Sequence, residues 1–269
     1  MALANDGVCV VDISKGSLRK DVVEQLRHCM DKQVMPAADR PELSVATRGS
    51  VWAFFTSESS KRSLLKDGSA CLFQEPSLDP RLLSSFDIVH RLSAFEGREA
   101  DRRSSGELLD STEEHNAPEV AETLKVHLQR AGLLPSPRVT RDARELLQAY
   151  YMLVRRSQSL GTENAYVSLA TLESLMRVAS ASARLFLRVE VLEMPDATLA
   201  IFMHERSLEA KFGEKVISRT FKSRQRAALG GALSGPPSSM AVDFEQELMD
   251  FHDDLEDYMA PLALHRPEE

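Results

Sequence analysis

Two kinds of short string in the sequence combine residue types that could carry chemistry. The strings Ser17–Lys20 and Ser63–Lys66 have the Ser-x-x-Lys spacing of some serine hydrolase nucleophiles. Nothing else of that constellation accompanies them, and a pattern of four residues recurs by chance. His28 and Cys29 are adjacent on a predicted helix without a second ligand pair in range. The sequence therefore favours neither a serine hydrolase nor a metal site.

A basic segment between Arg206 and Arg226 has the side chains needed to neutralise phosphate charge, with seven basic residues against two acidic ones. The candidates for nucleic-acid contact are Lys211, Lys215, Arg219, Lys222, Arg224 and Arg226. A solvated basic linker is the alternative interpretation of the same residues.

An acidic segment follows, with eight acidic residues and no basic one between Ala241 and Met259. The Gly/Ser/Pro-rich string Leu229–Met240 separates it from the basic segment and is typical of a flexible linker. Apolar residues in the acidic segment alternate steps of four and three, which predicts a helix with a narrow apolar seam: Phe244, Leu248, Phe251, Leu255 and Tyr258. This seam needs a partner surface in this chain or in another. The helix could fold back on the basic segment, although a solvated charged face is the commoner outcome.

The elements that position these residues begin with an α/β pattern. Of the 269 residues, 43% are hydrophobic and 28% charged, and the net charge of −8 is typical of a soluble globular protein. The apolar runs Gly7–Asp12 and Ser44–Thr56 predict parallel strands buried on both faces, with Trp52 and Phe54 in the core. The string Ser17–Gln33 predicts a helix between them, capped by Ser17, and the pattern continues to Phe86–Leu92.

The rest of the chain predicts helices. A polar, charged segment over 98–117 reads as an exposed linker. Helical spacing of apolar residues then predicts four helices that form a small bundle: Pro118–Ala131, Thr140–Ser157, Ser168–Arg188 and one beginning at Pro195. The predicted organisation is an α/β part over 1–97, the linker, a helical part over 118–206, a basic and Gly/Ser/Pro-rich linker over 207–240, and an acidic helix over 241–260. No run is long and apolar enough for a membrane helix, no signal peptide is recognisable, and Cys9, Cys29 and Cys71 read as reduced thiols.

Several strings resemble the minichromosome maintenance (MCM) family, the AAA+ motors of replicative helicases. They are VCVVD at 8–12, LRHCMDKQ at 26–33, RGSVWA at 48–53, LLSSFDIV at 82–89 and, most specifically, TLESLMRVASASARLFLR at 171–188. The resemblance covers about residues 8 to 210. It implies the C-terminal portion of an AAA+ parallel-sheet core followed by an all-helical lid. SVWAFFTSESS at 50–60, RSLEAKFGEKV at 206–216 and the acidic helix favour a divergent member associated with meiotic recombination.

The resemblance also locates the positions that ATP hydrolysis needs. The sequence has no GxxxxGK[ST] loop, so such a loop lies before Met1 or is absent, and ATP with magnesium is expected only if an upstream loop exists. Asp12 matches the first acid of the Walker B strand, but Ile13 stands where a Glu would orient water. Thr56 stands at the first polar sensor, Ser85 at the arginine finger and Ala170 at the second sensor arginine. These losses predict an inactive motor with Asp12 and Thr56 as relics.

In the same family a hairpin carries a lysine into the central pore, and it corresponds here to Val34–Ser50. The lysine position is Ala38, followed by Asp39, so DNA contact is expected to be weak or indirect. The resemblance therefore implies a nuclear, catalytically inactive scaffold that has no cofactor. It would act through protein partners, including other MCM-like proteins, in meiotic recombination and double-strand break repair. The alternatives are a working MCM helicase subunit that lacks its upstream half in this sequence and, less favoured, a DNA adaptor that uses the basic segment.

Overall fold

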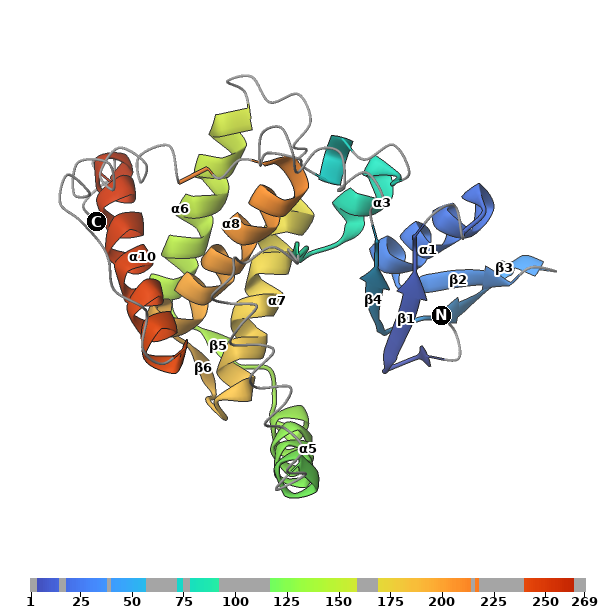
Figure 1. The fold of residues 1–269 in the computed structure, drawn as a ribbon, viewed down its shortest axis with the longest axis horizontal. Coiled ribbons are helices and arrows are strands. Elements are labelled where there is room, and N and C mark those ends of the chain that lie inside the picture. The colour runs from blue at the N-terminus through green and yellow to red at the C-terminus, as the bar shows by residue number, and fades with distance from the viewer. Residues whose placement is uncertain are drawn as a thin grey trace, which may run out of the picture. The chain divides into compact units, whose positions relative to one another are not determined.

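The computed structural model describes residues 4–14, 18–37, 40–56, 72–74, 78–91, 117–158, 169–213, 216–217 and 240–263 (Figure 1). They form two compact units. The first unit consists of Met1–Val89 with Ser207–Glu214, and the second consists of His90–Arg206 with Lys215–Glu269. Most described residues are helical, and the strands form small two-stranded sheets. No helix within the described ranges is long and apolar enough to span a membrane.

The first unit contains a parallel strand pair. β1 (Val8–Asp12) lies beside β4 (Ser50–Phe54), in a register that runs from Val8 opposite Ser50 to Asp12 opposite Phe54. Side chains alternate between the two faces, as in any strand. One face is half-buried, whereas the other exposes Val8, Val10, Trp52 and Phe54, the last two at 60% each. The prediction of burial on both faces, with Trp52 and Phe54 in the core, is wrong for the described part of the chain.

A helix and a hairpin complete the first part of this unit. α1 (Lys20–Lys32) buries Leu26 and Cys29, and Arg19 rather than the predicted Ser17 takes the N-cap position. α1 ends at Lys32, and its C-cap residue Gln33, with a φ of 55°, turns the chain directly into a hairpin. The hairpin pairs β2 (Val34–Ala37) with β3 (Arg40–Ala46) antiparallel.

The α/β pattern was expected to continue over Phe86–Leu92, but the described residues 86–91, after α3 (Pro80–Ser85), form neither a helix nor a strand. Two side chains from the end of α8 (Thr198–Phe212) form hydrogen bonds with the backbone of this segment instead. The Phe86 carbonyl accepts a hydrogen bond of 2.6 Å from Lys211 Nζ, and the Val89 N–H donates to Ser207 Oγ at 3.0 Å. In this segment, side-chain partners replace the neighbouring strand that a ladder would require.

The second unit is helical. Besides the first turns of α8, it contains α5 (Ala117–Leu133), α6 (Arg141–Gln158), α7 (Leu169–Leu185) and α10 (Met240–Ala263). Two short strands, β5 (Arg138–Val139) and β6 (Glu190–Val191), pair in parallel. The buried core includes Leu146, Leu147, Tyr150, Tyr151, Val154, Leu175, Ala179, Ala183 and Ile201. Helical spacing predicted most of this core correctly, but it did not predict Ile201. Four residues predicted to face inward are exposed: Leu124, Leu128, Met176 and Phe186.

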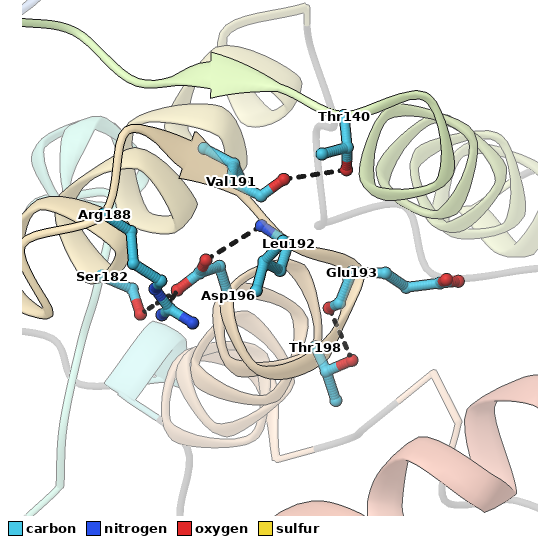
Figure 2. A network of polar contacts seen from close by, with 8 residues as sticks. All are labelled: Thr140, Ser182, Arg188, Val191, Leu192, Glu193, Asp196 and Thr198. Atoms are coloured by element: carbon cyan, nitrogen blue, oxygen red, sulfur yellow. Dashed lines mark hydrogen bonds and ion pairs between the residues drawn. The ribbon is translucent and has the colours of Figure 1, made fainter.

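A buried carboxylate organises the turn that leads from α7 to α8 (Figure 2). Asp196 is 0% exposed and lies in η3 (Glu193–Ala197), just before α8. It accepts hydrogen bonds from Ser182 Oγ at 2.7 Å, Arg188 Nη2 at 2.5 Å and the Leu192 N–H at 3.0 Å. Three donors from α7, the following turn and the chain after β6 thus converge on one side chain and fix the path between the two helices.

Candidate functional site

The predicted site residues Asp12 and Thr56 lie near each other because their strands are parallel neighbours. β1 and β4 end at the same edge, where Asp12 is opposite Phe54 and Thr56 follows two residues later. Ser14 connects the two ends. Its N–H donates to Asp12 Oδ1 at 2.9 Å, and its Oγ accepts a hydrogen bond of 2.8 Å from the Thr56 N–H. Carboxyl ends of parallel strands are where ligands commonly bind in open α/β sheets.

Ser14 also stabilises the charge at this edge. Hydrogen bonds from its backbone N–H and then from its hydroxyl lower the pKa of Asp12 and so favour the ionised carboxylate. An ionised carboxylate beside hydroxyl groups suits a magnesium ion that also binds nucleotide phosphates. The next residue is Ile13, whose aliphatic side chain cannot accept a hydrogen bond from water. The edge therefore keeps one acid expected of a motor and lacks the acid that hydrolysis requires.

Ser14 was not predicted as a site residue. The signal for it was local, because an Asp followed two residues later by Ser is typical of a turn in which the carboxylate accepts a backbone hydrogen bond. The observed Asp12–Ser14 contact is of this kind.

The positions expected to carry arginines are neutral and lie in different units. Ser85 is the last residue of α3, and its hydroxyl donates to the Arg81 carbonyl at 3.2 Å within the same helix. Ala170 is an exposed residue in the first turn of α7. Neither side chain can offer a positive charge to a phosphate. The structure thus gives Ser85 a local structural role at the end of α3.

Lys211 does not fit the prediction of a nucleic-acid contact. Its side chain is buried, with 8% of the residue exposed, and Nζ donates to the Phe86 carbonyl. Burial lowers the pKa of Lys211 to about 8, although the charge of Asp87 opposes this shift. An ammonium group buried in this way is not available to a phosphate. The other predicted candidates lie outside the described residues: Lys215, Arg219, Lys222, Arg224 and Arg226.

The hairpin expected between Val34 and Ser50 is present as β2 and β3. The two residues at its tip, Ala38 and Asp39, lie outside the described residues. Its sequence still lacks a lysine at the tip, so the expectation of weak DNA contact there stays a prediction.

A second buried carboxylate, Glu205 on α8, was also missed. It is 2% exposed and accepts a hydrogen bond of 2.6 Å from the Tyr150 hydroxyl. Its other oxygen accepts from the backbone N–H groups of Val216 at 2.9 Å and Ile217 at 3.3 Å. Burial raises the pKa of Tyr150 well above its usual range, and the charge and hydrogen bond of Glu205 add to the effect. This Tyr150–Glu205 clamp fixes the chain where the basic segment continues beyond α8.

The helical part of the chain corresponds to a known domain, since residues 122–208 match the MCM AAA-lid domain. "Probable DNA helicase MCM9" of Oryza sativa subsp. indica is 30% identical over 219 residues, which is 77% of this chain and 31% of that protein. The Arabidopsis thaliana protein of the same name is 29% identical over 216 residues, 77% of this chain and 32% of that protein. The "Minichromosome maintenance protein MCM" of Saccharolobus solfataricus is 27% identical over 136 residues, 49% of this chain and 20% of that protein.

These matches extend beyond the lid, but the chain spans only about a third of the length of the two plant relatives. The lid match and the three relatives agree on one family. The chain therefore belongs to the MCM family, with residues 122–208 as its AAA-lid domain.

Proposed function

We propose that this chain is a catalytically inactive MCM-like scaffold, which acts through protein contacts in the nucleus during meiotic recombination and double-strand break repair. Membership of the MCM family supports a role on chromosomal DNA. The finer role follows the resemblance to MCM domain-containing protein 2, the divergent, meiosis-associated member that the strings at 50–60 and 206–216 favour. Its partners would include other MCM-like proteins, and it would use no cofactor.

The observation that carries the proposal is the edge at Asp12. This ionised carboxylate has Ile13 as its neighbour where a water-orienting acid is expected, and Ser14 binds both Asp12 and the backbone at Thr56. Ser85 and Ala170 support the same conclusion, because loss of an arginine finger alone lowers the rate by roughly 10³ to 10⁵ in related enzymes. Ile13, Ser85 and Ala170 are neutral at three positions where a working motor needs a charged side chain. The loss of all three supports the loss of the activity.

The test is ATP turnover by the polypeptide as the cell makes it, compared with its Asp12→Asn variant. We expect both to hydrolyse ATP only at the buffer background, since Asp12 serves no reaction. Asp6→Asn, another exposed aspartate of the first unit, is the matched control. Turnover above background that Asp12→Asn removes and Asp6→Asn preserves would refute the scaffold.

The biological role has a separate test in meiotic cells that lack the protein. The wild type and the Asp12→Asn variant should restore double-strand break repair equally well if protein contacts carry the function. Rescue by the wild type alone would mean that the Asp12 edge still does chemistry.

A working MCM helicase subunit is the second candidate. The juxtaposition of Asp12 and Thr56 at one strand edge favours it, as do the relatives named as probable helicases. In that case a phosphate loop and an arginine would have to come from elsewhere in the protein or from a neighbouring subunit. The turnover experiment distinguishes this candidate from the scaffold.

A DNA adaptor is the weaker third candidate, because Lys211 is buried. The remaining basic residues can be tested by a salt-dependent DNA titration of a variant with Lys215, Lys222 and Arg224 neutralised. A DNA-binding segment would lose affinity and part of its salt dependence in this variant. Unchanged binding would exclude it.

A further inference from the structure

One face of α8 is covered by α10, and its contacts define a compact docking surface. Thr198, Phe202 and Arg206 follow one another at four-residue spacing on that face and are called the α8 stripe. Thr198 Oγ1 lies 2.9 Å from Nδ1 of His252, and Arg206 Nη2 lies 2.6 Å from Glu247 Oε1. Phe202 is the middle residue of the stripe.

Aromatic rings supply the apolar part of the contact. Phe202 meets Phe251 edge-on at 5.2 Å between centroids and Phe244 edge-on at 6.0 Å. The Arg206 guanidinium lies 5.1 Å from the centre of the Phe202 ring while it pairs with Glu247. The stripe therefore contacts an aromatic–acid–aromatic pattern at positions i, i+3 and i+7 of a helix: Phe244, Glu247 and Phe251.

The docking of α10 combines buried and exposed contacts. Leu248 and Leu255 are buried, but Phe244 is 44% exposed, and the two side chains of the Arg206–Glu247 pair are about half exposed. Such an exposed pair contributes orientation more than affinity. The contact between α8 and α10 therefore depends on which residues meet, although part of it remains exposed to solvent.

Charge on α10 weakens it as a free helix. Asp250 with Asp254, and Asp253 with Asp257, place like charges four residues apart, which destabilises an isolated helix. In proteins, most of the stability of a helix comes from the packing of its amphipathic face. Part of the free energy of docking must therefore be used to order α10 as a helix. The net free energy of docking is smaller than the contacts alone would give.

α10 is joined to the rest of the second unit by residues 218–239, whose sequence is rich in Gly, Ser and Pro after residue 229. A connection of that length holds a ligand near its site at an effective concentration on the order of millimolar. The covalent connection therefore favours α10 on the α8 stripe over a free helix of the same intrinsic affinity.

We propose that the α8 stripe is a helix-docking site, that α10 fills it as a tethered and displaceable ligand, and that a partner protein's helix with the same aromatic–acid–aromatic pattern takes its place. This inference rests on the proposed scaffold function, because it names the surface through which the scaffold binds. Its test does not involve ATP, so the two proposals can fail separately.

The test uses a fluorescein-labelled peptide of residues 240–263, which has the pattern of the proposed partner, and fluorescence anisotropy with the full chain. Phe251→Ala in the chain weakens the tethered helix and frees the stripe. We expect this variant to bind the peptide at least about tenfold more tightly than the wild type does, because a larger fraction of the stripe is vacant. Met249→Ala, a change at an exposed apolar residue of the same helix, is the matched control and should leave the affinity unchanged.

Two further variants locate the binding on the stripe. Adding Phe202→Ala to Phe251→Ala should abolish the gain. Adding Arg206→Glu instead should weaken the wild-type peptide and strengthen a peptide that carries Glu247→Arg, a reversal that partial unfolding of the variant could not produce. Equal peptide affinities of the wild type and Phe251→Ala, or binding that survives Phe202→Ala, would overturn the proposal.

Discussion

Replacing Lys211 with methionine tests whether the buried ammonium group makes the stability of the first unit depend on pH. Lys211 is buried against the Phe86 carbonyl, and its pKa is lowered from 10.5 to about 8. Between those two values the unfolded chain retains a proton that the folded chain has released. The free energy of unfolding must therefore rise with pH in this window.

The size of the effect follows from the shift. Each pH unit between the two pKa values contributes about 1.4 kcal/mol. From pH 7 to pH 9.5, the free energy of unfolding of the first unit should increase by about 2 kcal/mol, since the change begins only near pH 8. Lys211→Met should remove this dependence. At pH 7 we expect the variant to be close to the wild type in stability, because relief from burying the charge offsets the lost hydrogen bond to Phe86.

The assay is urea unfolding at a series of pH values from 7 to 9.5, followed by tryptophan fluorescence. The chain contains one tryptophan, Trp52, and it lies on β4 in the first unit, so the signal reports on that unit. Lys32→Met removes an exposed lysine of the same unit and should retain the wild-type pH dependence. A wild type whose midpoint does not rise with pH, or a Lys211→Met variant that keeps the rise, would refute the reasoning.

Three other predictions concern stability. Asp196→Ala should cost about 3–5 kcal/mol in thermal or urea unfolding, because it leaves the buried donors around it unpaired; a cost below about 1 kcal/mol would contradict the network. Gly49→Ala should destabilise the first unit, since its Cβ would lie 2.7 Å from a backbone oxygen, whereas Gly132→Ala meets nothing within 4 Å and should stabilise α5 by up to about 1 kcal/mol; the reverse order of melting temperatures would contradict this. Tyr150→Phe should lower stability by about 1–3 kcal/mol at pH 7. Because the folded state raises the pKa of Tyr150, the wild-type second unit should also lose stability as the pH rises above about 10, and the variant should not, as circular dichroism can show.

The helices of the second unit could be predicted from the sequence because helical spacing of apolar residues leaves a strong, local signal. Leu146, Leu147, Tyr150 and Val154 repeat on one face of α6, and all are buried. The helix ends were less well predicted. Pro195 lies in η3, which leads directly into α8, and α8 continues to Phe212, into the segment expected to be a linker.

The strands show the limit of the same method. A short apolar run such as Val8–Val11 indicates a strand but not whether one or both of its faces are covered. That depends on what the rest of the fold places against it, and here Val10 and Trp52 are exposed. The parallel pairing itself, and with it the approach of Asp12 to Thr56, was predictable because their order and polarity follow from the resemblance.

The buried polar residues could not be predicted. Glu205 and Lys211 lie among charged neighbours in the sequence and resemble ordinary solvent-facing residues. Their burial follows from partners that are distant in the chain, such as Tyr150 for Glu205 and Phe86 for Lys211. A charged side chain becomes a structural residue only when such partners are in place.

The course of α8 matters for anyone who wishes to produce the lid alone. The family match stops at residue 208, yet the helix runs on to Phe212. The last turns of α8 belong to the first unit. Ser207 and Leu208 are buried there, at 1% and 7% exposed. A fragment cut at the family boundary would lose the final turn of the helix and leave Leu208 at a fraying end. The boundary of the family domain and the end of the folded helix thus fall at different residues of α8.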